Sequence, residues 1–289
     1  MEYIKVAEAA KKWGLSDRRV RVLCQEAKIE GVTKNGGIYL IPANAEKPAD
    51  NRRLKGKVIP KAYQPLFAKI DSLKEKNKGK KPKTDFLVDF IYNSNAIVGN
   101  SLSKEETSMV LDGKTIDKKP LKDHLETVGG RDAYSYMLEL VSKKTVLNEE
   151  IIKNIHSLVL LDKPEYKGVY RHMPVKVLGA FHLPPEPYKI GNKIVKLLDE
   201  FSKSKAHPIE KAAYFLIKFE GIHPFFNGNS RTGRIILNMN LIRNGYLPIS
   251  IKKSDKIRYY ECIDSYYRDT TTEAMVKLIA ERLEEEYNI

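Results

Sequence analysis

The sequence predicts a mostly α-helical protein: an all-helical core with a short β-hairpin, preceded by a small winged helix-turn-helix domain. Apolar residues recur at helical spacing over most of the chain after residue 85. A short alternating segment near residue 175 interrupts this pattern and predicts the hairpin. The first part of the chain differs from this pattern, because it has short helices, a Gly-Gly turn and an excess of basic residues. We therefore expect domains at 1–57 and 85–289, joined by a lysine-rich segment over 58–84.

The N-terminal segment has the pattern of helix, tight turn, helix and β-wing. Val6–Trp13 predicts a short helix and Asp17–Ala27 a second one, with Ser16 as the residue that caps its start. Asn35-Gly36-Gly37 lies between two apolar stretches, which is typical of a hairpin. Together these elements predict a winged helix-turn-helix.

The second helix of this segment is basic. It carries Arg18, Arg19 and Arg21, and residues 1–57 hold 13 Lys and Arg against 7 Asp and Glu. The order of elements resembles the N-terminal module of the excisionase and MerR-like families, which implies DNA binding through this helix in the major groove. Sequence-specific binding would need a homodimer. The alternative is a winged-helix module that mediates protein contacts.

The connecting segment is polar and basic. Pro42 to Pro60 has the composition of a linker, and Lys61–Leu73 predicts a helix between the two domains. Lys74–Lys83 carries six lysines and one glutamate, which is typical of a solvated tether.

Helical patterns follow from residue 85 onward, at Asp85–Asn93, Ser103–Leu111, Lys122–Lys143 and Asn148–Leu161. Ser103 and Glu106 have the spacing of a capping box. His124 and His156 are interpreted as helix residues and not as ligands. The later segment 175–185 alternates and ends in two prolines, which predicts a hairpin whose unpaired edge can take up a peptide.

Composition limits the partners and the compartment. A formal net charge of +14 and a pI near 9.4 favour polyanions such as nucleic acid, a nucleotide or an acidic protein face. Cys24 and Cys262 lie far apart and predict two buried thiols, with neither a disulfide framework nor a metal site. No leader and no apolar run of spanning length is apparent, so we expect a cytoplasmic protein without a membrane partner.

The stretch 223–234 (HPFFNGNSRTGR) holds a base, a turn and two arginines. His223 precedes a proline and therefore lies at a break after a helix. The turn over 227–230 can direct successive N–H groups into one concavity, and Arg231 and Arg234 can reach a polyphosphate at the start of the next helix. Each feature alone is ordinary turn or surface chemistry. Their conjunction indicates a histidine base for a hydroxyl that attacks phosphorus.

This stretch resembles the signature loop of the Fic (filamentation-induced-by-cAMP) family, H-P-F-x-[DE]-G-N-G-R-x-x-R. The resemblance implies that His223 is the general base on a target-protein hydroxyl and that Phe225 anchors the loop. It also implies ATP as a substrate, with its distal phosphates at Arg231 and the γ-phosphate beside Arg234. The expected anion hole comprises Gly228, Asn229 and Ser230.

Two positions depart from the family pattern. Asn227 replaces the acidic ligand for Mg²⁺ or Mn²⁺, and a neutral amide oxygen binds a hard cation more weakly than a carboxylate. Ser230 replaces a glycine, and its β-carbon restricts a turn that needs positive φ. The resemblance thus predicts a recognisable site with reduced activity.

Residues 94–100 resemble the inhibitory helix motif of Fic proteins, [ST]-x-x-x-E-[GN], through Ser94, Gly99 and Asn100. Val98 stands in place of the glutamate that pairs, in the family, with the residue corresponding to Arg234. We therefore expect Arg234 to be free and the intrinsic inhibition to be absent. The alternative is a plain helix followed by a Gly-Asn cap.

The predicted hairpin resembles the Fic flap, which aligns a target segment over the base. Its expected residues are Val175, Val177, Leu178 and Gly179. His182 is interpreted as part of this flap and not as a catalyst. The resemblance also places part of Lys256–Tyr267 near the nucleotide base, although periodicity alone predicts only a packed helix there.

Two functions follow. The first is a protein adenylyltransferase that moves AMP from ATP to a Ser, Thr or Tyr hydroxyl of a target protein, including this chain itself, with Mg²⁺ neutralising the departing pyrophosphate. The second is a DNA-binding regulator whose core binds nucleotide with little or no transfer, or transfers a different nucleotide. His223, Arg231 and Arg234 favour the first; Asn227 and Ser230 favour the second.

Overall fold

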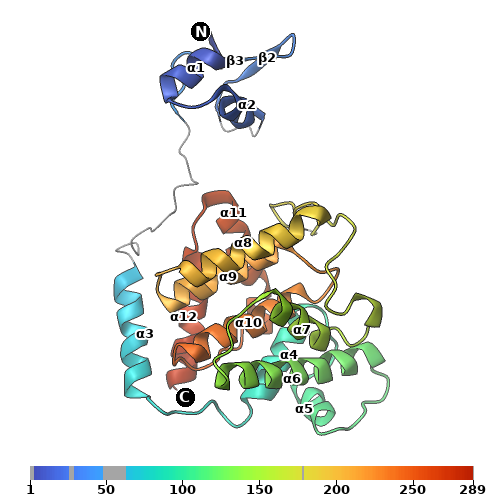
Figure 1. Ribbon diagram of the computed structural model, residues 1–289. Helices are drawn as coiled ribbons and strands as arrows, with labels where there is room; N and C mark the ends of the chain where they lie inside the picture. Colours follow the sequence, from blue (N-terminus) through green and yellow to red (C-terminus); the bar gives the residue numbers. More distant parts are fainter. Residues whose placement is uncertain (1–2, 26–28, 48–62, 178, 289) are drawn as a thin grey trace. The chain divides into compact units, whose positions relative to one another are not determined.

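The computed structural model describes residues 3–25, 29–47, 63–177 and 179–288, and it divides the chain into two compact units (Figure 1). The first comprises residues 1–55 and the second residues 56–289. Each unit has its own hydrophobic core, so each is described by itself. The predictions for the ends of the second helix and of the linker, at 26–28 and 48–62, lie outside the described residues.

The first unit packs two short helices on a three-stranded antiparallel sheet of order β1-β3-β2. The helices are α1 (Val6–Trp13) and α2 (Asp17–Gln25); the strands are β1 (Tyr3–Lys5), β2 (Thr33–Asn35) and β3 (Ile38–Pro42). Gly14 adopts the left-handed conformation, with φ of 63°, and ends α1. The predicted first helix and hairpin are confirmed, whereas β1 was not predicted.

The second unit is helical wherever it has regular structure in its described part. Its α-helices are α3 (Gln64–Lys76), α4 (Phe86–Ile97), α5 (Lys104–Leu111), α6 (Leu121–Ser142), α7 (Glu149–Val159), α8 (Ile190–Lys203), α9 (Pro208–Ile222), α10 (Asn229–Arg243), α11 (Lys256–Asp269) and α12 (Glu273–Asn288). The Ser103–Glu106 capping box is confirmed: the Ser103 N–H donates to Glu106 Oε2 over 2.7 Å, and the Glu106 N–H donates to Ser103 Oγ over 3.1 Å.

Helix α10 forms the centre of this unit. Nearly all of its residues are buried, including the polar ones, and it packs against α4, α6, α7 and α9. Figure 1 shows α10 enclosed by these helices. A helix that is buried on every side can hold charged groups only if they are paired or hydrogen-bonded. The two buried arginines of α10, Arg231 and Arg234, therefore need partners inside the protein.

The predicted hairpin over 175–185 is not formed, because this segment has no strand in its described residues. The backbone groups that would pair across a hairpin have other partners. The Phe181 N–H donates to Asp264 Oδ1 over 2.9 Å, and the Met173 and Pro185 carbonyls accept from Arg171 over 3.0 and 2.6 Å. Proline lacks an N–H to donate to a ladder, and three prolines lie at the ends of the segment. The described residues of this segment form an irregular loop.

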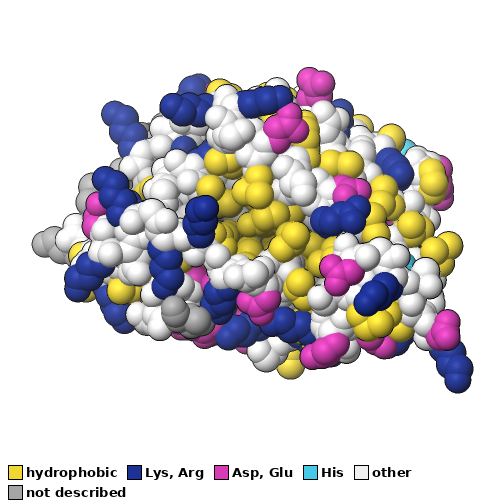
Figure 2. All heavy atoms as spheres, turned by 90° about the horizontal axis from the view of Figure 1, so that it is seen from below, with side chains coloured by type: hydrophobic (Ala, Val, Ile, Leu, Met, Phe, Trp, Pro, Cys, Tyr) yellow, Lys and Arg dark blue, Asp and Glu magenta, His cyan; other side chains and the backbone are white. Residues whose placement is uncertain are grey.

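Hydrophobic side chains also reach the surface of the second unit. Figure 2 shows them gathered in a hollow on one face, with Lys, Arg, Asp and Glu around it. None of the helices in the described ranges has the length and apolarity needed to cross a bilayer.

Candidate active site

The loop between α9 and α10 is bounded by two residues in the left-handed conformation. His223 ends α9 with φ of 48° and ψ of 59°, and Gly228 precedes α10 with φ of 76°. A β-carbon on Gly228 would lie 3.2 Å from Nε2 of His156, so this position suits glycine. Helix α10 begins at Asn229 without a side-chain cap, and its first N–H groups have no intrahelical acceptor. These groups can bind an anion.

Phe225 and Asn229 close the loop on itself. The Phe225 N–H donates to Asn229 Oδ1, and Asn229 Nδ2 donates to the Phe225 carbonyl, each over 2.9 Å. Both residues are buried, and Phe225 is fully enclosed. Asn229, which the resemblance placed in the anion hole, therefore fixes the loop through its side chain, and only its backbone N–H is available to a ligand.

His156 of α7 holds the same loop from outside. Its ring stacks on Phe225 with 3.6 Å between ring centroids. The Gly168 N–H donates to Nδ1 over 2.9 Å, so the proton lies on Nε2, which donates to the Asn227 carbonyl over 2.9 Å. Burial lowers the pKa of His156 to about 4. The prediction of a helix histidine is confirmed, but the sequence did not indicate its contact with the loop.

His223 is a neutral imidazole at ordinary pH. Burial lowers its pKa to about 4, and the nearby charge of Arg171 contributes to the shift. The buried Arg171 guanidinium donates through Nε to the His223 carbonyl over 2.8 Å. A neutral imidazole is the form that can accept a proton. Arg171 was not among the residues expected from the sequence.

Ser230 lies in the first turn of α10 and has no positive φ. The expectation that its β-carbon would strain the loop is therefore wrong, because the left-handed positions are His223 and Gly228. Its hydroxyl donates to Glu220 Oε2 over 2.9 Å, and the Tyr259 hydroxyl donates to Oε1 over 2.6 Å. Burial raises the pKa of Glu220, whereas these hydroxyls act against the rise.

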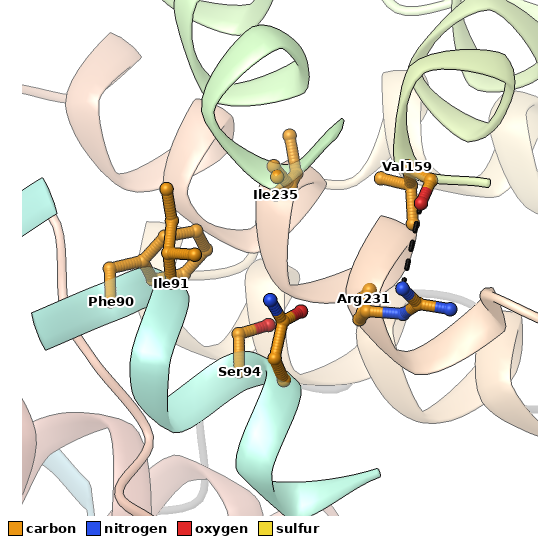
Figure 3. Close-up of a pocket in the computed structure, with 8 residues that line it drawn as sticks. Phe90, Ile91, Ser94, Val159, Arg231 and Ile235 are labelled. Carbon is orange, nitrogen blue, oxygen red and sulfur yellow. Dashed lines mark hydrogen bonds between the residues drawn. The ribbon is translucent and has the colours of Figure 1, made fainter. Parts of the chain in front are cut away.

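Arg231 is paired and enclosed. Its Nη1 lies 3.3 Å from Glu126 Oε1, with both side chains almost completely buried. Figure 3 shows Arg231 directed toward the Val159 carbonyl, which accepts from Nη1 over 3.5 Å. The adjoining cavity, lined by Ser94 and Arg231 among others, has a volume of about 10 Å³, enough for one water molecule. Nucleotide phosphates cannot enter it in this conformation.

Arg234 is buried too, but its partners are neutral. Nε and Nη2 donate to the side chain and the carbonyl of Ser94 over 3.1 and 2.7 Å, and the guanidinium lies over the Tyr259 ring at 5.5 Å. Ser94 therefore occupies two of its donors, and the expectation that Arg234 is free of the inhibitory ion pair stays a prediction. No carboxylate in the described ranges lies within ion-pair distance of it. Val98, which follows Ser94 by four residues at the end of α4, is 37% exposed.

One donor on each of these arginines has no partner among the described residues. These are Nε of Arg231 and Nη1 of Arg234, both buried. Buried donors without partners cost free energy, so such groups are commonly completed by a water or a ligand. Gly99 adopts φ of 99° after α4, and Asn100 Nδ2 donates to Glu126 Oε2 over 2.9 Å. The segment 94–100 therefore contacts both arginines, directly through Ser94 and indirectly through Asn100.

The residues present do not provide a good site for Mg²⁺. The Asn227 side-chain oxygen accepts from the Gly228 N–H over 2.6 Å, so one of its lone pairs is occupied. The described chain brings no group of three His, Cys, Asp or Glu side chains together in a metal-binding arrangement. A hard cation here would depend on oxygens from its own nucleotide.

The other predicted site residues lie as follows. Val175 and Val177 are half-buried in the irregular loop and Gly179 is exposed, while Leu178 lies outside the described residues. In the first unit, Arg18 and Arg21 are exposed on α2. The side chain of Arg19 is outside the described part.

Comparison with known proteins agrees with this arrangement. The model of the Fic/DOC family matches residues 146–241. The chain is 30% identical over 237 residues to a protein adenylyltransferase Fic of Drosophila persimilis and 31% identical over 235 residues to one of Aedes aegypti. The matches cover 77% and 76% of this chain but 46% of each relative, so the chain spans about half the length of these relatives.

Solved structures share the fold. Fic-1 (residues 134–508) of C. elegans matches with a TM-score of 0.71 and 22% identity, over 78% of this chain and 71% of that one. A Fic-domain signalling protein of Bacteroides thetaiotaomicron matches with a TM-score of 0.68 and 24% identity, over 77% and 94%. The second unit of this chain therefore contains a domain of the Fic/DOC family.

Proposed function

We propose that this protein is an adenylyltransferase that moves AMP from ATP to a hydroxyl of a protein. The observation that carries the proposal is the neutral, partly exposed His223 in a loop that leads directly into the uncapped start of α10. A base and an anion site so placed suit a hydroxyl that attacks a phosphorus atom. The relatives named adenylyltransferases support this choice of reaction.

In the proposed step, the oxygen of a Ser, Thr or Tyr hydroxyl bonds to the α-phosphorus of ATP. His223 accepts the hydroxyl proton, the bond from the α-phosphorus to the bridging oxygen breaks, and pyrophosphate leaves with that electron pair. The N–H groups of Asn229 and Ser230 are the proposed donors to the phosphate oxygens, joined by that of Gly228 once it leaves the Asn227 side-chain oxygen. Such preorganised donors stabilise charge that develops in the transition state.

The two arginines of α10 are the proposed contacts of the distal phosphates. Each has one buried donor without a partner, which a phosphate oxygen could satisfy. Arg234 is the stronger candidate, because its positive charge is not neutralised by a paired carboxylate among the described side chains. Both side chains are enclosed, so the surrounding segments must open before a phosphate reaches either one, and for Arg231 the contact with Val159 must open as well.

ATP and Mg²⁺ or Mn²⁺ are the proposed substrate and cofactor. The cation would supply positive charge to the pyrophosphate. Since Asn227 offers only a neutral oxygen, we expect the nucleotide and not the protein to hold most of the metal ligands. Asn227→Asp should therefore strengthen the response to the cation.

DNA and a target protein, which can be a second copy of this chain, are the proposed partners. The exposed Arg18 and Arg21 on α2, beside a hairpin wing, favour DNA binding by the first unit, as a homodimer for specific sites. The alternative function is a DNA-binding regulator whose core binds nucleotide with little transfer. The enclosed side chain of Arg231 favours that alternative.

The test is incubation of the full chain with ATP labelled at the α-phosphate, or separately at the γ-phosphate, with Mg²⁺ or Mn²⁺. Adenylyl transfer predicts protein label from the α-position only, and its loss in His223→Ala. Label from the γ-position would indicate phosphoryl transfer. Label in neither case, including with Asn227→Asp and with the other nucleoside triphosphates, would support the regulator and contradict the transferase.

A further inference from the structure

Arg171 contacts several carbonyl groups on both sides of the candidate base. Its side chain is 4% exposed and donates to four carbonyl oxygens, those of His223, Met173, Pro185 and Ile222, over 2.8, 3.0, 2.6 and 3.5 Å. Its own N–H donates to the Pro224 carbonyl over 2.9 Å. Among the described residues, no carboxylate forms an ion pair with it.

These contacts connect two segments that are far apart in the sequence. The carbonyls of Ile222, His223 and Pro224 belong to consecutive residues at the end of α9. Those of Met173 and Pro185 belong to the two ends of the irregular loop. A planar guanidinium with five N–H donors in a fixed geometry can serve all these carbonyls, whereas a lysine ammonium has three donors on a flexible stem.

The backbone of His223 needs such support. It lies in the left-handed region, with φ of 48°, which is uncommon for a residue other than glycine. A conformation of this kind persists only where the surrounding structure fixes it. Arg171 holds the carbonyls before, at and after this residue and therefore opposes its relaxation.

We propose that Arg171 is a positioning residue: it fixes the backbone of His223 and ties the irregular loop over 173–185 to the candidate base. This inference rests on the proposed role of His223. It assigns no contact between Arg171 and the substrate. Arg171 acts through the carbonyls that it holds, so its loss should displace the base and release both ends of the loop together.

The test compares Arg171→Lys, which keeps the charge, and Arg171→Gln with a matched control, Arg243→Lys. Arg243 also donates its guanidinium to a backbone carbonyl, that of Thr145, at the far end of α10. Hydrogen exchange needs no catalysis: in both Arg171 variants the hydrogen-bonded amides of Ala180, Phe181 and Phe225 should exchange at least about tenfold faster, with α12 unchanged. The control should leave these amides as in the wild type.

Enzyme kinetics provide a second test of the positioning role. A misplaced base should lower kcat for AMP transfer by about a hundredfold in Arg171→Lys while KM for ATP changes by less than about threefold. If the wild type shows no transfer, the proposed function fails, but hydrogen exchange still tests the positioning role. Unchanged exchange in the Arg171 variants overturns the inference, as does a kcat equal to that of the wild type.

If the variants do not fold, the wild-type protein gives the answer. A guanidinium that donates to buried carbonyls should have an Nε–H that exchanges slowly with water. This Nε–H should give a protected arginine resonance, assigned to Arg171 because it remains in the spectra of variants of the other arginines. Rapid exchange of every arginine Nε–H would overturn the inference.

Discussion

Arg231 and Arg234 lie one turn apart on α10, are both buried, and are held in opposite ways. Arg231 is paired with the carboxylate of Glu126, which itself accepts from Asn100. In the described chain Arg234 donates only to neutral groups, the side chain and carbonyl of Ser94, and lies over the Tyr259 ring, with the Glu220 carboxylate as a nearby charge that forms no ion pair with it. The first is a charge-neutral structural pair, whereas the second keeps its positive charge close to the start of the helix.

The difference shows how a buried helix can combine stability with a ligand site. An ion pair in the interior is costly to break, because a single charge is left without water. A guanidinium fixed by neutral groups retains its attraction for an anion. We therefore assign the structural role chiefly to Arg231 and the recognition of phosphate chiefly to Arg234. The following changes test this assignment, in order of expected effect.

Removing the partner of Arg231 should have the largest effect. Glu126→Ala leaves the guanidinium buried without its carboxylate and should lower the free energy of unfolding by about 3–5 kcal/mol. Glu281→Ala, which breaks the exposed pair with Arg258, should cost less than about 1 kcal/mol. Urea unfolding of the full chain, followed by the tyrosine signal, measures both. Equal losses in the two variants would contradict the structural role of Arg231.

Acid should loosen the loop that precedes both arginines. The pKa of His156 is about 4 when folded and near 6.5 when unfolded, so the unfolded state binds more protons between these values. This contribution is therefore present in full above pH 6.5, declines as the pH falls and is lost below pH 4, with a total of about 3 kcal/mol.

His156→Gln, which cannot titrate, provides the control for this pH effect. Unfolding measured at pH 7 and pH 4.5 should show a smaller loss of stability in the variant than in the wild type. The same loss in both would assign the acid sensitivity to other groups, among them His223.

A carboxylate placed near Arg234 should pair with its guanidinium, as Glu126 pairs with Arg231. Residue 98 follows Ser94 by four positions, one helical turn, so Val98→Glu can place a carboxylate near the unpartnered Nη1 of Arg234. We expect AMP transfer to fall about tenfold, equivalent to 1.4 kcal/mol, with little change in stability. Val98→Gln is the uncharged control. A loss of transfer in both variants would point to steric disturbance and not to charge.

Removing the hydroxyl of Ser94 should have the smallest effect. Ser94→Ala deletes the acceptor of Nε of Arg234 but keeps the carbonyl that accepts from Nη2, so the expected loss of stability is about 1 kcal/mol. Thermal unfolding of the variant beside Ser202→Ala, whose hydroxyl is exposed on α8, measures it. A loss as large as that of Glu126→Ala would mean that Arg234 is the structural residue of the two.

The sequence predicts the parts of this site that are local. The helices on either side of the loop, the capping box at Ser103 and the break at His223 follow from short-range rules, because each depends on neighbours within one turn. The conformation of Ser230 does not follow from such rules, because the sequence does not show which loop residue takes the left-handed conformation.

Contacts between distant segments were not predictable in the same way. His156 meets the Asn227 carbonyl across 71 positions, and Arg171 meets that of His223 across 52. Nothing in the periodicity of α7 distinguishes His156 from an ordinary helix residue. The prediction of a hairpin was wrong for the same reason. Arg171 and Asp264 form hydrogen bonds with backbone groups that the local pattern assigned to pairing between two strands.

The most direct test of the assignment is the affinity for ATP of Arg234→Gln, measured by calorimetry beside the wild type. Arg258→Gln, which removes a guanidinium from an exposed ion pair, controls for the loss of one positive charge. We predict that Arg234→Gln stays folded and binds ATP at least about tenfold more weakly, whereas the control binds as the wild type does. Wild-type affinity in Arg234→Gln would contradict the assignment of phosphate recognition to this arginine.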